Sequence, residues 1–302
     1  MLVLRIVGCI VLFCAFSFLE SKGVKVKMKR YFSFFVVLTF CLLSFSVYAQ
    51  VLGGLHFYMP FEEGEGNIAK DVGPKGFEAA LHATAKFVEN GKYGGAIEFS
   101  AGSAKIDEPG GKSELYTEHL TVAVWIYPYE ISAEVLGNGH VYGNIFFHKS
   151  GSSDDNVEFG LGSGQGLYWY INAGQEDMGP FDGTDVDITV PLPELGMKTD
   201  TWYHVVGTFD GENLRVYLDG ELKGEKAVPA NGPVMIWNDN PLEFGGRGTG
   251  GNAYKGLMDE LVVYDRALTD AEVVRVMNAQ DFFAVDAAGK LTTTWGNLKT
   301  RW

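Results

Sequence analysis

The chain beyond residue 49 contains no cysteine. The three cysteines of the 302-residue sequence are Cys9, Cys14 and Cys41, and all of them precede that point. A domain formed by the remaining residues therefore has no disulfide framework, no cysteine-based zinc site and no thiol nucleophile. Its stability must come from a hydrophobic core, and a chain of this length can bury a large one.

Basic residues and proline are also scarce. Lysine and arginine number 24 against 38 aspartates and glutamates, which gives a formal net charge of −14. A nucleic-acid-binding protein needs a basic stripe, and the sequence has none, so we expect no nucleic-acid partner. The chain has only 10 prolines but 39 glycines, and 14% of its residues are aromatic. This composition favours a single all-β sandwich or barrel.

Two apolar runs, residues 1–19 and 31–48, stand at the N-terminus with a basic segment between them. Counted from Met28, the second run has the positive start, the apolar segment and the small residues of a secretory signal cut after Ala49. We therefore predict that translation starts at Met28 and that residues 1–49 form a signal or targeting region. The mature protein would be secreted, extracellular or at the cell surface, or else periplasmic.

Two short membrane spans, or one uncleaved anchor, are the alternatives for this N-terminal region. A span needs about 20 apolar residues, so the run at 31–48 is borderline in length. Its cleavage signature favours removal. After cleavage we expect no stable membrane span.

Strand patterns and turns fill the rest of the chain. In the central stretch, Leu214, Val216 and Leu218 alternate with polar residues, which is typical of a strand with one buried face. Asp219-Gly220 then predicts a hairpin with a primed turn. Further strands are predicted at 55–61, 87–88, 96–99, 120–127, 145–149, 157–161, 167–171, 234–237, 242–245 and 256–264.

Two segments do not follow the strand pattern. Residues 174–200 carry many acidic residues and three prolines, and we expect a long irregular loop there. Thr269 and Glu272 form a capping box, which predicts one helix that runs to about Ala279. Residues 282–302 form a tail that the sequence does not assign.

Many short strands followed by one late helix predict an all-β fold over residues 50–281. The specific prediction is an antiparallel two-sheet jelly-roll sandwich with one short C-terminal helix.

Three segments resemble the laminin G-like jelly-roll domains of the concanavalin A-like lectin/glucanase superfamily, in their secreted bacterial form. They are residues 57–64 with Asp71-Val72-Gly73, residues 202–220, and residues 256–269, and together they span about 54–278. The resemblance implies two antiparallel sheets, one of them concave. It also implies binding of carbohydrate or of an extracellular protein ligand, and often of one Ca²⁺. Many relatives carry a disulfide near the end of the domain, which this chain lacks.

The resemblance places a structural Ca²⁺ between the first loop and the last strand. It implies Asp71 and Asp259 as ligands, with Glu62 or carbonyl groups near it. Ca²⁺ takes six to eight oxygen ligands and mixes carboxylates with backbone carbonyls, so this donor set suits it. The alternative is that Asp71 forms a turn and Asp259 caps a strand end.

Carbohydrate sites pair an aromatic platform with polar groups that fix orientation. Two places in the sequence offer such pairs. Tyr168 and Tyr170 share one face of a strand whose other face carries Trp169, and Trp237 with Asn238 lies at a strand end. Large aromatic residues are mostly buried, so we expect Trp125, Trp169 and Trp202 in the core.

No catalytic motif stands out. The sequence has no Glu-x-Asp-x-x-Glu strand pattern of the glucanases and no Gly-x-Ser-x-Gly elbow. Asp259 and Glu260 are adjacent, so we expect them to point to opposite faces of a strand. We predict a non-catalytic ligand-binding module, with carbohydrate as the ligand. An extracellular protein-interaction or adhesion module is one alternative, and a polysaccharide-active hydrolase with carboxylates from distant strands is another.

Overall fold

The computed structural model describes residues 53–106, 118–131, 144–150, 155–162, 166–171, 186–228, 241–246 and 253–278. These residues belong to a compact unit that runs from Gln50 to Trp302. In the described ranges, no helix is long and apolar enough to cross a bilayer.

The first sheet, here called sheet A, has eight strands. They are β1 (Leu55–Met59), β4 (Lys86–Tyr93), β5 (Gly95–Phe99), β7 (Leu120–Pro128), β12 (Tyr203–Phe209), β13 (Asn213–Leu218), β14 (Glu221–Ala227) and β16 (Gly256–Tyr264). Their order is β14-β13-β12-β7-β16-β5-β4, and β1 pairs with β16 outside this path. The long strands β7 and β16 therefore form the centre of sheet A.

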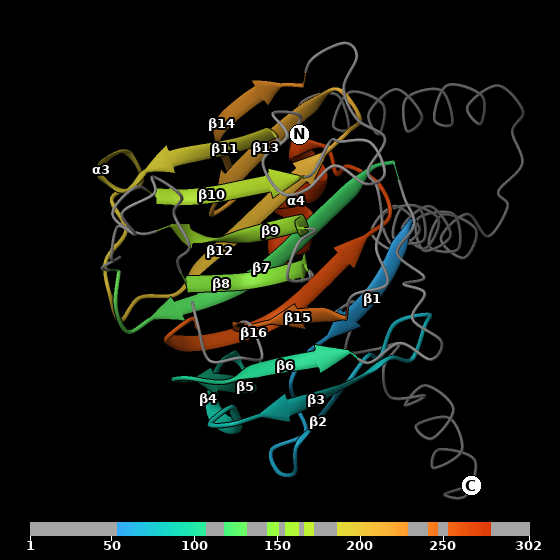
Figure 1. Ribbon diagram of the computed structural model, residues 1–302, viewed down its shortest axis with the longest axis vertical. Coiled ribbons are helices and arrows are strands. Elements are labelled where there is room, and N and C mark those ends of the chain that lie inside the picture. Colours follow the sequence, from blue (N-terminus) through green and yellow to red (C-terminus); the bar gives the residue numbers. More distant parts are fainter. Residues whose placement is uncertain are drawn as a thin grey trace, which may run out of the picture. The chain divides into compact units, whose positions relative to one another are not determined.

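The second sheet, sheet B, also has eight strands. They are β2 (Ile68–Lys70), β3 (Glu78–His82), β6 (Ser103–Ile106), β8 (Asn144–Ser150), β9 (Asp155–Gly162), β10 (Gly166–Ile171), β11 (Val186–Pro191) and β15 (Leu242–Phe244). Their order is β11-β10-β9-β8-β15-β6-β3-β2, and every pair in both sheets is antiparallel. Figure 1 shows the strands of sheet B crossing those of sheet A. The predicted antiparallel two-sheet sandwich is confirmed.

The core lies between the two sheets and follows the alternation of each strand. Val122, Val124 and Ile126 of β7 point into it and are fully buried, and Trp169 of β10 meets them from sheet B. The prediction that Trp169 is a core residue is confirmed. Gly207 of β12 lies directly over this indole, because a Cβ there would be 2.7 Å from Trp169 Cδ2. A side chain at position 207 would therefore collide with the core.

The central meander has the predicted turn. Asp219 and Gly220 join β13 to β14 with φ values of 49° and 80°, the positive φ at both positions that a type I′ turn requires. The strands β12, β13 and β14 that it connects are consecutive in sheet A. Residues 201–225 therefore form one edge of this sheet.

The prediction of an irregular loop over 174–200 is wrong for its second half. Val186, Ile188 and Val190 alternate with polar residues, are buried, and form β11. A short helix, α3 (Leu192–Leu195), follows and ends at Gly196. The acidic and proline-rich composition of the stretch concealed this alternation. The strand predicted at 234–237 lies outside the described residues.

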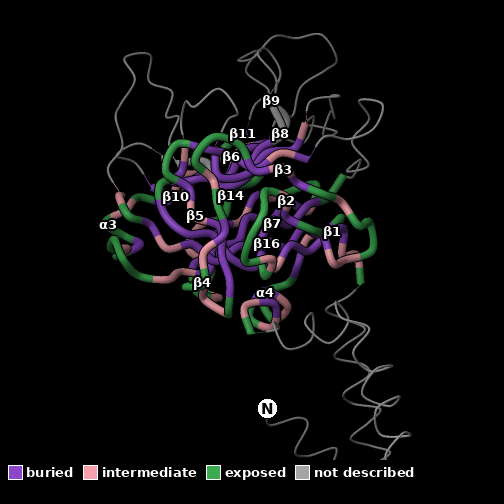
Figure 2. The backbone as a smooth tube through the Cα atoms, turned by 90° about the horizontal axis from the view of Figure 1, so that it is seen from below, coloured by how far each residue is buried: buried purple, intermediate pink, exposed green. Residues whose placement is uncertain are grey.

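The predicted C-terminal helix is α4 (Asp270–Met277), and its capping box is present. The helix packs on the face of sheet A that points away from sheet B, as Figure 2 shows. Below it lies a second apolar cluster: Tyr58, Ala123, Val206, Tyr217, Val262, Tyr264, Leu268, Val273 and Val276. Part of the outer face of sheet A is therefore covered.

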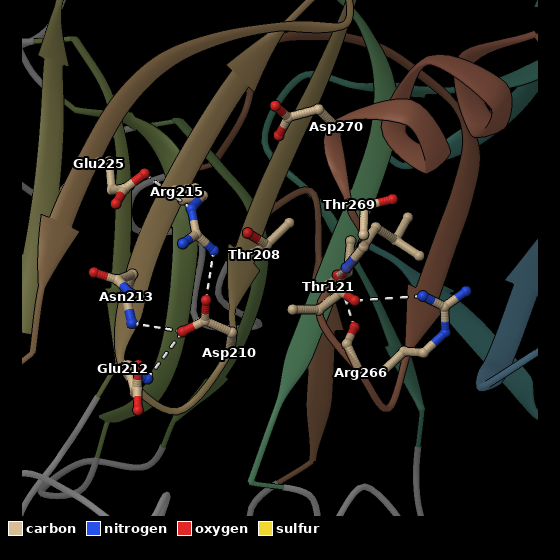
Figure 3. A network of polar contacts seen from close by, with 12 residues as sticks. Thr121, Thr208, Asp210, Glu212, Asn213, Arg215, Glu225, Arg266, Thr269 and Asp270 are labelled. Atoms are coloured by element: carbon tan, nitrogen blue, oxygen red, sulfur yellow. Dashed lines mark hydrogen bonds and ion pairs between the residues drawn. The ribbon is translucent and has the colours of Figure 1, made fainter. Parts of the chain in front are cut away.

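Polar contacts fix α4 on the sheet (Figure 3). The guanidinium of Arg266 binds both carboxylate oxygens of Glu272 at 2.9 and 3.0 Å. The hydroxyl of Tyr217 donates to Asp270 at 2.8 Å. The hydroxyl of Thr121 donates to the carbonyl of Arg266 at 2.8 Å and accepts from the amide of Leu268 at 3.0 Å. The helix is thus held by side chains from β7 and β13.

Candidate metal and binding sites

Asp71 organises the loop that follows β2. It is buried, and its Oδ1 accepts hydrogen bonds from the amides of Tyr58 at 2.9 Å and Gly73 at 2.6 Å. Its Oδ2 accepts from the amides of Gly76 at 2.7 Å and Phe77 at 3.3 Å. Both oxygens therefore bind backbone donors, which gives Asp71 a structural role. Glu62 and Asp259 are the other two predicted calcium ligands.

Asp259 and Glu260 lie on the same side of β16, contrary to the sequence-based expectation. The pairing of β16 with β7 shifts between Asp259 and Val262, and Glu260 has φ 54°. This β-bulge inserts an extra residue and interrupts the alternation of side chains. Asp259 pairs with Trp125 on the outer face of sheet A, and Glu260 accepts a 2.5 Å hydrogen bond from the hydroxyl of Tyr58 on that same face.

The glycine-rich turn between β4 and β5 lies against Asp259 and Glu62. The amide of Tyr93 donates to Asp259 Oδ2 at 2.9 Å, and the amide of Gly95 donates to Glu62 Oε1 at 3.2 Å. A Cβ at Gly94 would be 2.4 Å from Glu62 Oε1. A Cβ at Gly91 would likewise be 2.9 Å from Asp259 Oδ2, so the turn approaches the two carboxylates this closely only because positions 91 and 94 are glycine.

Asp259 and Glu260 are thus adjacent buried carboxylates, and exposed Glu62 lies near enough to act on both electrostatically. Burial, and then the charges of Glu260 and Glu62, raise the pKa of Asp259 to about 8. Burial and the charge of Glu62 raise the pKa of Glu260 to about 7. Burial, followed by Glu260, also raises the pKa of the Tyr58 hydroxyl. In the described part of the chain, Asp259 Oδ1 is buried and has no hydrogen-bond partner.

A divalent cation would neutralise this cluster and use the unpartnered oxygen. The oxygen donors suit Ca²⁺, whose coordination shell mixes carboxylates with carbonyls. No group of three or more His, Cys, Asp or Glu side chains has metal-binding geometry within the described ranges. Backbone carbonyls would therefore have to complete the shell.

A row of polar and aromatic side chains crosses the outer face of sheet B. The strand register places its members side by side on consecutive strands: Asp187, Tyr170, Glu158, His148, Glu243 and Lys105. Their sequence neighbours, Trp169 and Phe147 among them, point into the core, so these six side chains point away from it. We call this set the sheet B row.

Of the two predicted ligand-binding tyrosines, Tyr170 belongs to this row and Tyr168 lies beside it on the same face of β10. Tyr168 is buried, and its hydroxyl donates to Glu158, whereas Tyr170 is half-buried. His148 is also buried, with its Nε2 3.1 Å from the carbonyl oxygen of Gly246 and 3.8 Å from Glu243. Trp237 and Asn238, the other predicted pair, lie outside the described residues.

Sequence reasoning did not find Glu158, His148, Glu243 and Lys105. Each occupies an outward position of an alternating strand, which is the only signal that the sequence offers. Their alignment needs the register of four strands, and two of those pairings join segments almost 100 residues or more apart, such as His148 with Glu243.

His204 of β12 is buried on the outer face of sheet A against Trp125, with ring centroids 5.2 Å apart. In the described part of the chain, its Nδ1 has no hydrogen-bond partner. Burial, and then the charge of Lys92, lower its pKa from 6.5 to about 3. The histidine is therefore neutral in the folded protein at ordinary pH.

We expect His204 to make the fold sensitive to acid. Below pH 6.5 the unfolded chain gains a proton at this residue and the folded chain does not, so stability is lost as the pH falls toward 3. The loss is about 1.4 kcal/mol per pH unit. Urea unfolding at pH 7 and pH 4.5 should show a smaller loss for His204→Phe than for the unaltered protein. An equal loss in both would contradict this assignment.

The architecture defines the class of the protein. Two antiparallel sheets packed face to face, with a capped helix after the last strand, form a concanavalin A-like jelly roll. A family model described as Laminin_G_3, concanavalin A-like lectin/glucanases superfamily, matches residues 100–274. The chain belongs to this laminin G-like family, as its three sequence segments predicted.

Solved structures share the fold at low sequence identity. The binding domain of Paraclostridial mosquitocidal protein 1 superposes with a TM-score of 0.56 at 16% identity, covering 76% of this chain and 53% of that one. The binding domain of botulinum neurotoxin DC in complex with SialylT gives 0.53 at 12%, covering 76% and 52%. This chain therefore spans about half the length of those toxin domains.

A third structure is similar over nearly its whole length. It is domain 4 of AbnA, an extracellular GH43 arabinanase of Geobacillus stearothermophilus, in complex with arabinotriose. Its TM-score is 0.50 at 19% identity, and the match covers 74% of this chain and 98% of that domain. No curated protein matches the sequence. At these identities the likeness establishes the fold.

Proposed function

We propose that the protein is a secreted, non-catalytic carbohydrate-binding module. The observation that carries this proposal is the sheet B row, in which half-buried Tyr170 lies between Asp187 and Glu158. Glu158 is buried and accepts from Tyr168, whereas the Asp187 side chain is 58% exposed. An aromatic ring beside an exposed carboxylate suits a sugar, because the ring packs on its apolar face while the carboxylate accepts hydrogen bonds from its hydroxyls. Two of the structural neighbours were solved with saccharides, SialylT and arabinotriose. The proposed export rests on the signal-like segment that ends at Ala49.

We further propose a structural Ca²⁺ held by Glu62 and Asp259, with backbone carbonyls as the remaining ligands. The support is the buried, unpartnered Oδ1 of Asp259 and the glycine turn packed on both carboxylates. The ion would join β16 to the loop after β1 and would offset the repulsion among the acids.

A polysaccharide hydrolase is the second candidate, because Glu158 and Glu243 lie on either side of His148 in the sheet B row. Strands are about 4.8 Å apart, so the backbones of the two glutamates are about 10 Å apart. A retaining mechanism needs carboxyl groups at about 5 Å, and an inverting one allows up to about 9.5 Å. Release of reducing ends from polysaccharides would support this candidate over the binding module.

Tyr170→Ala is expected to weaken oligosaccharide binding about tenfold, the effect of losing one well-placed aromatic contact. Isothermal titration with an oligosaccharide identified on a glycan array measures the change. Tyr203→Ala is the matched control, since Tyr203 is also half-buried but belongs to sheet A and packs against the core. Unchanged affinity in Tyr170→Ala would exclude the sheet B row as the binding site.

A further inference from the structure

The part of the outer face of sheet A that α4 leaves open carries a group of aromatic side chains. Along β7, Ala123 lies in the cluster under α4, and Trp125 and Tyr127 follow at alternate positions on the same face. Tyr129 comes directly after the end of β7 at Pro128. Trp202 lies directly before the neighbouring strand β12, and its ring packs on that of Tyr127. The prediction that Trp202 is a core residue is wrong, because the residue is only half-buried and packs against an outward-facing tyrosine.

Three of these rings form a continuous surface, here called the aromatic platform: Trp202, Tyr127 and Tyr129. The ring centroids of Trp202 and Tyr127 are 5.4 Å apart, and those of Tyr127 and Tyr129 are 6.1 Å apart. Tyr129 is 42% exposed, one of the three most exposed large hydrophobic side chains in the described part of the chain. Tyr127 and Trp202 are half-buried beside it, so the exposed ring continues into a larger apolar patch, and such patches mark interaction sites.

The backbone under the platform is fixed at the ends of the central strands. The amide of Tyr129 donates to the carbonyl of Lys255 at 2.9 Å, and the amide of Asp200 donates to the carbonyl of Pro128 at 2.9 Å. Gly256 at the start of β16 pairs with Pro128 at the end of β7. The rings are therefore held in place before any ligand arrives, which lowers the entropic cost of binding.

Two of the carboxylates around the platform are paired with lysines. Glu98 accepts from the hydroxyl of Tyr129 at 2.9 Å and binds Lys86 at 2.8 Å. Glu130 binds Lys255 at 2.9 Å. Asp200 adds a further carboxylate beside Tyr129, and the whole chain carries −14, so the rim offers hydrogen-bonding groups and repels an anion. A ligand that fits has flat apolar faces and many hydroxyl groups and carries no charge.

We propose that the aromatic platform is a second carbohydrate-binding surface, which takes a neutral oligosaccharide. This inference rests on the proposed function. The aromatic platform lies on the opposite side of the sandwich from the sheet B row. Outward residues of sheet A form the platform, and outward residues of sheet B form the row, with the core between them. One molecule therefore binds two sugar chains and links them, with the gain in avidity that two sites give.

The test uses the full chain and four probes: cellohexaose, xylohexaose, mannohexaose and the anionic hexagalacturonic acid. Isothermal titration compares the unaltered protein with Tyr129→Ala and with the double variant Tyr127→Ala/Trp202→Ala. Leu222→Ala is the matched control, because Leu222 is 43% exposed on β14 and lies away from the platform. Thermal unfolding of each variant verifies that it is folded.

The expected result is about tenfold weaker binding of a neutral hexaose by Tyr129→Ala, with no change for Leu222→Ala. If the unaltered protein binds and Tyr129→Ala binds equally well, the platform is not a sugar site, while the proposed function stands. If no probe binds, the proposed function fails together with the second site. Tighter binding of hexagalacturonic acid than of any neutral hexaose would overturn the assigned ligand class. Loss of self-association in Tyr129→Ala, with sugar binding unchanged, would make the platform a contact between copies of the chain.

Discussion

Replacing Asp71 with alanine is expected to lower the free energy of unfolding by about 4 kcal/mol, because a buried carboxylate that accepts several backbone hydrogen bonds is removed. Four amides lose their acceptor, among them that of Tyr58 in β1. Such amides are costly to leave unpaired inside a protein. Urea unfolding followed by tryptophan fluorescence measures the change.

Asp210→Ala provides the control for this experiment. Asp210 also accepts from two backbone amides, those of Glu212 at 2.9 Å and Asn213 at 2.6 Å, and it pairs with Arg215 at 2.5 Å. Its side chain is 29% exposed, so water can replace it. We expect a loss of about 1 kcal/mol there. Asp71→Asn should fall between the two alanine variants, because the amide keeps only one acceptor oxygen. A loss of less than about 1 kcal/mol in Asp71→Ala would show that the loop does not depend on this carboxylate.

Removal of the proposed Ca²⁺ is expected to destabilise the protein by about 3 kcal/mol, for an ion supplied at a hundred times its dissociation constant. Without a cation, burial and then the neighbouring glutamates raise the pKa of Asp259 and of Glu260, so the charged cluster is unfavourable. Melting temperatures measured at pH 7.5 with Ca²⁺ and with a chelator give the difference. Asp259→Asn should abolish the response, since the amide is a much poorer ligand for Ca²⁺ than the carboxylate.

Glu65→Gln is the matched control for the calcium experiment. Glu65 belongs to the same loop as Glu62, is exposed, and is not part of the cluster. This variant should keep the full response to Ca²⁺. Equal melting temperatures of the unaltered protein in Ca²⁺ and in chelator would refute a structural ion at Glu62 and Asp259.

The predictions that depend on local pattern held. The strand predicted at 120–127, the alternation around Val216, the positive φ at Asp219-Gly220 and the capping box of Thr269 and Glu272 are all present in the structure. Each of these depends on residues a few positions apart, so the chain itself carries the information.

The irregular loop predicted over 174–200 failed locally, because its composition concealed the alternation of β11, whereas two other failed predictions depend on distant contacts. Asp259 and Glu260 share a face because β16 has a bulge where it pairs with β7. The local sequence does not predict this bulge. Trp202 looked like a core residue by its size, yet it packs on Tyr127 at the outer surface. Which face of a strand is covered depends on what packs there, and α4 covers only part of the outer face of sheet A.

By itself, the sequence determined the class of the fold, the order of most strands along the chain and the absence of disulfides from the domain. It did so because periodicity and turn chemistry are local properties. Only the tertiary structure decided which side chains meet: the acidic cluster under the glycine turn, the sheet B row and the aromatic platform. Strand register brings these residues together. Register is set by packing between segments that are distant in the sequence, such as those of Glu158 and Glu243, which both pair with His148.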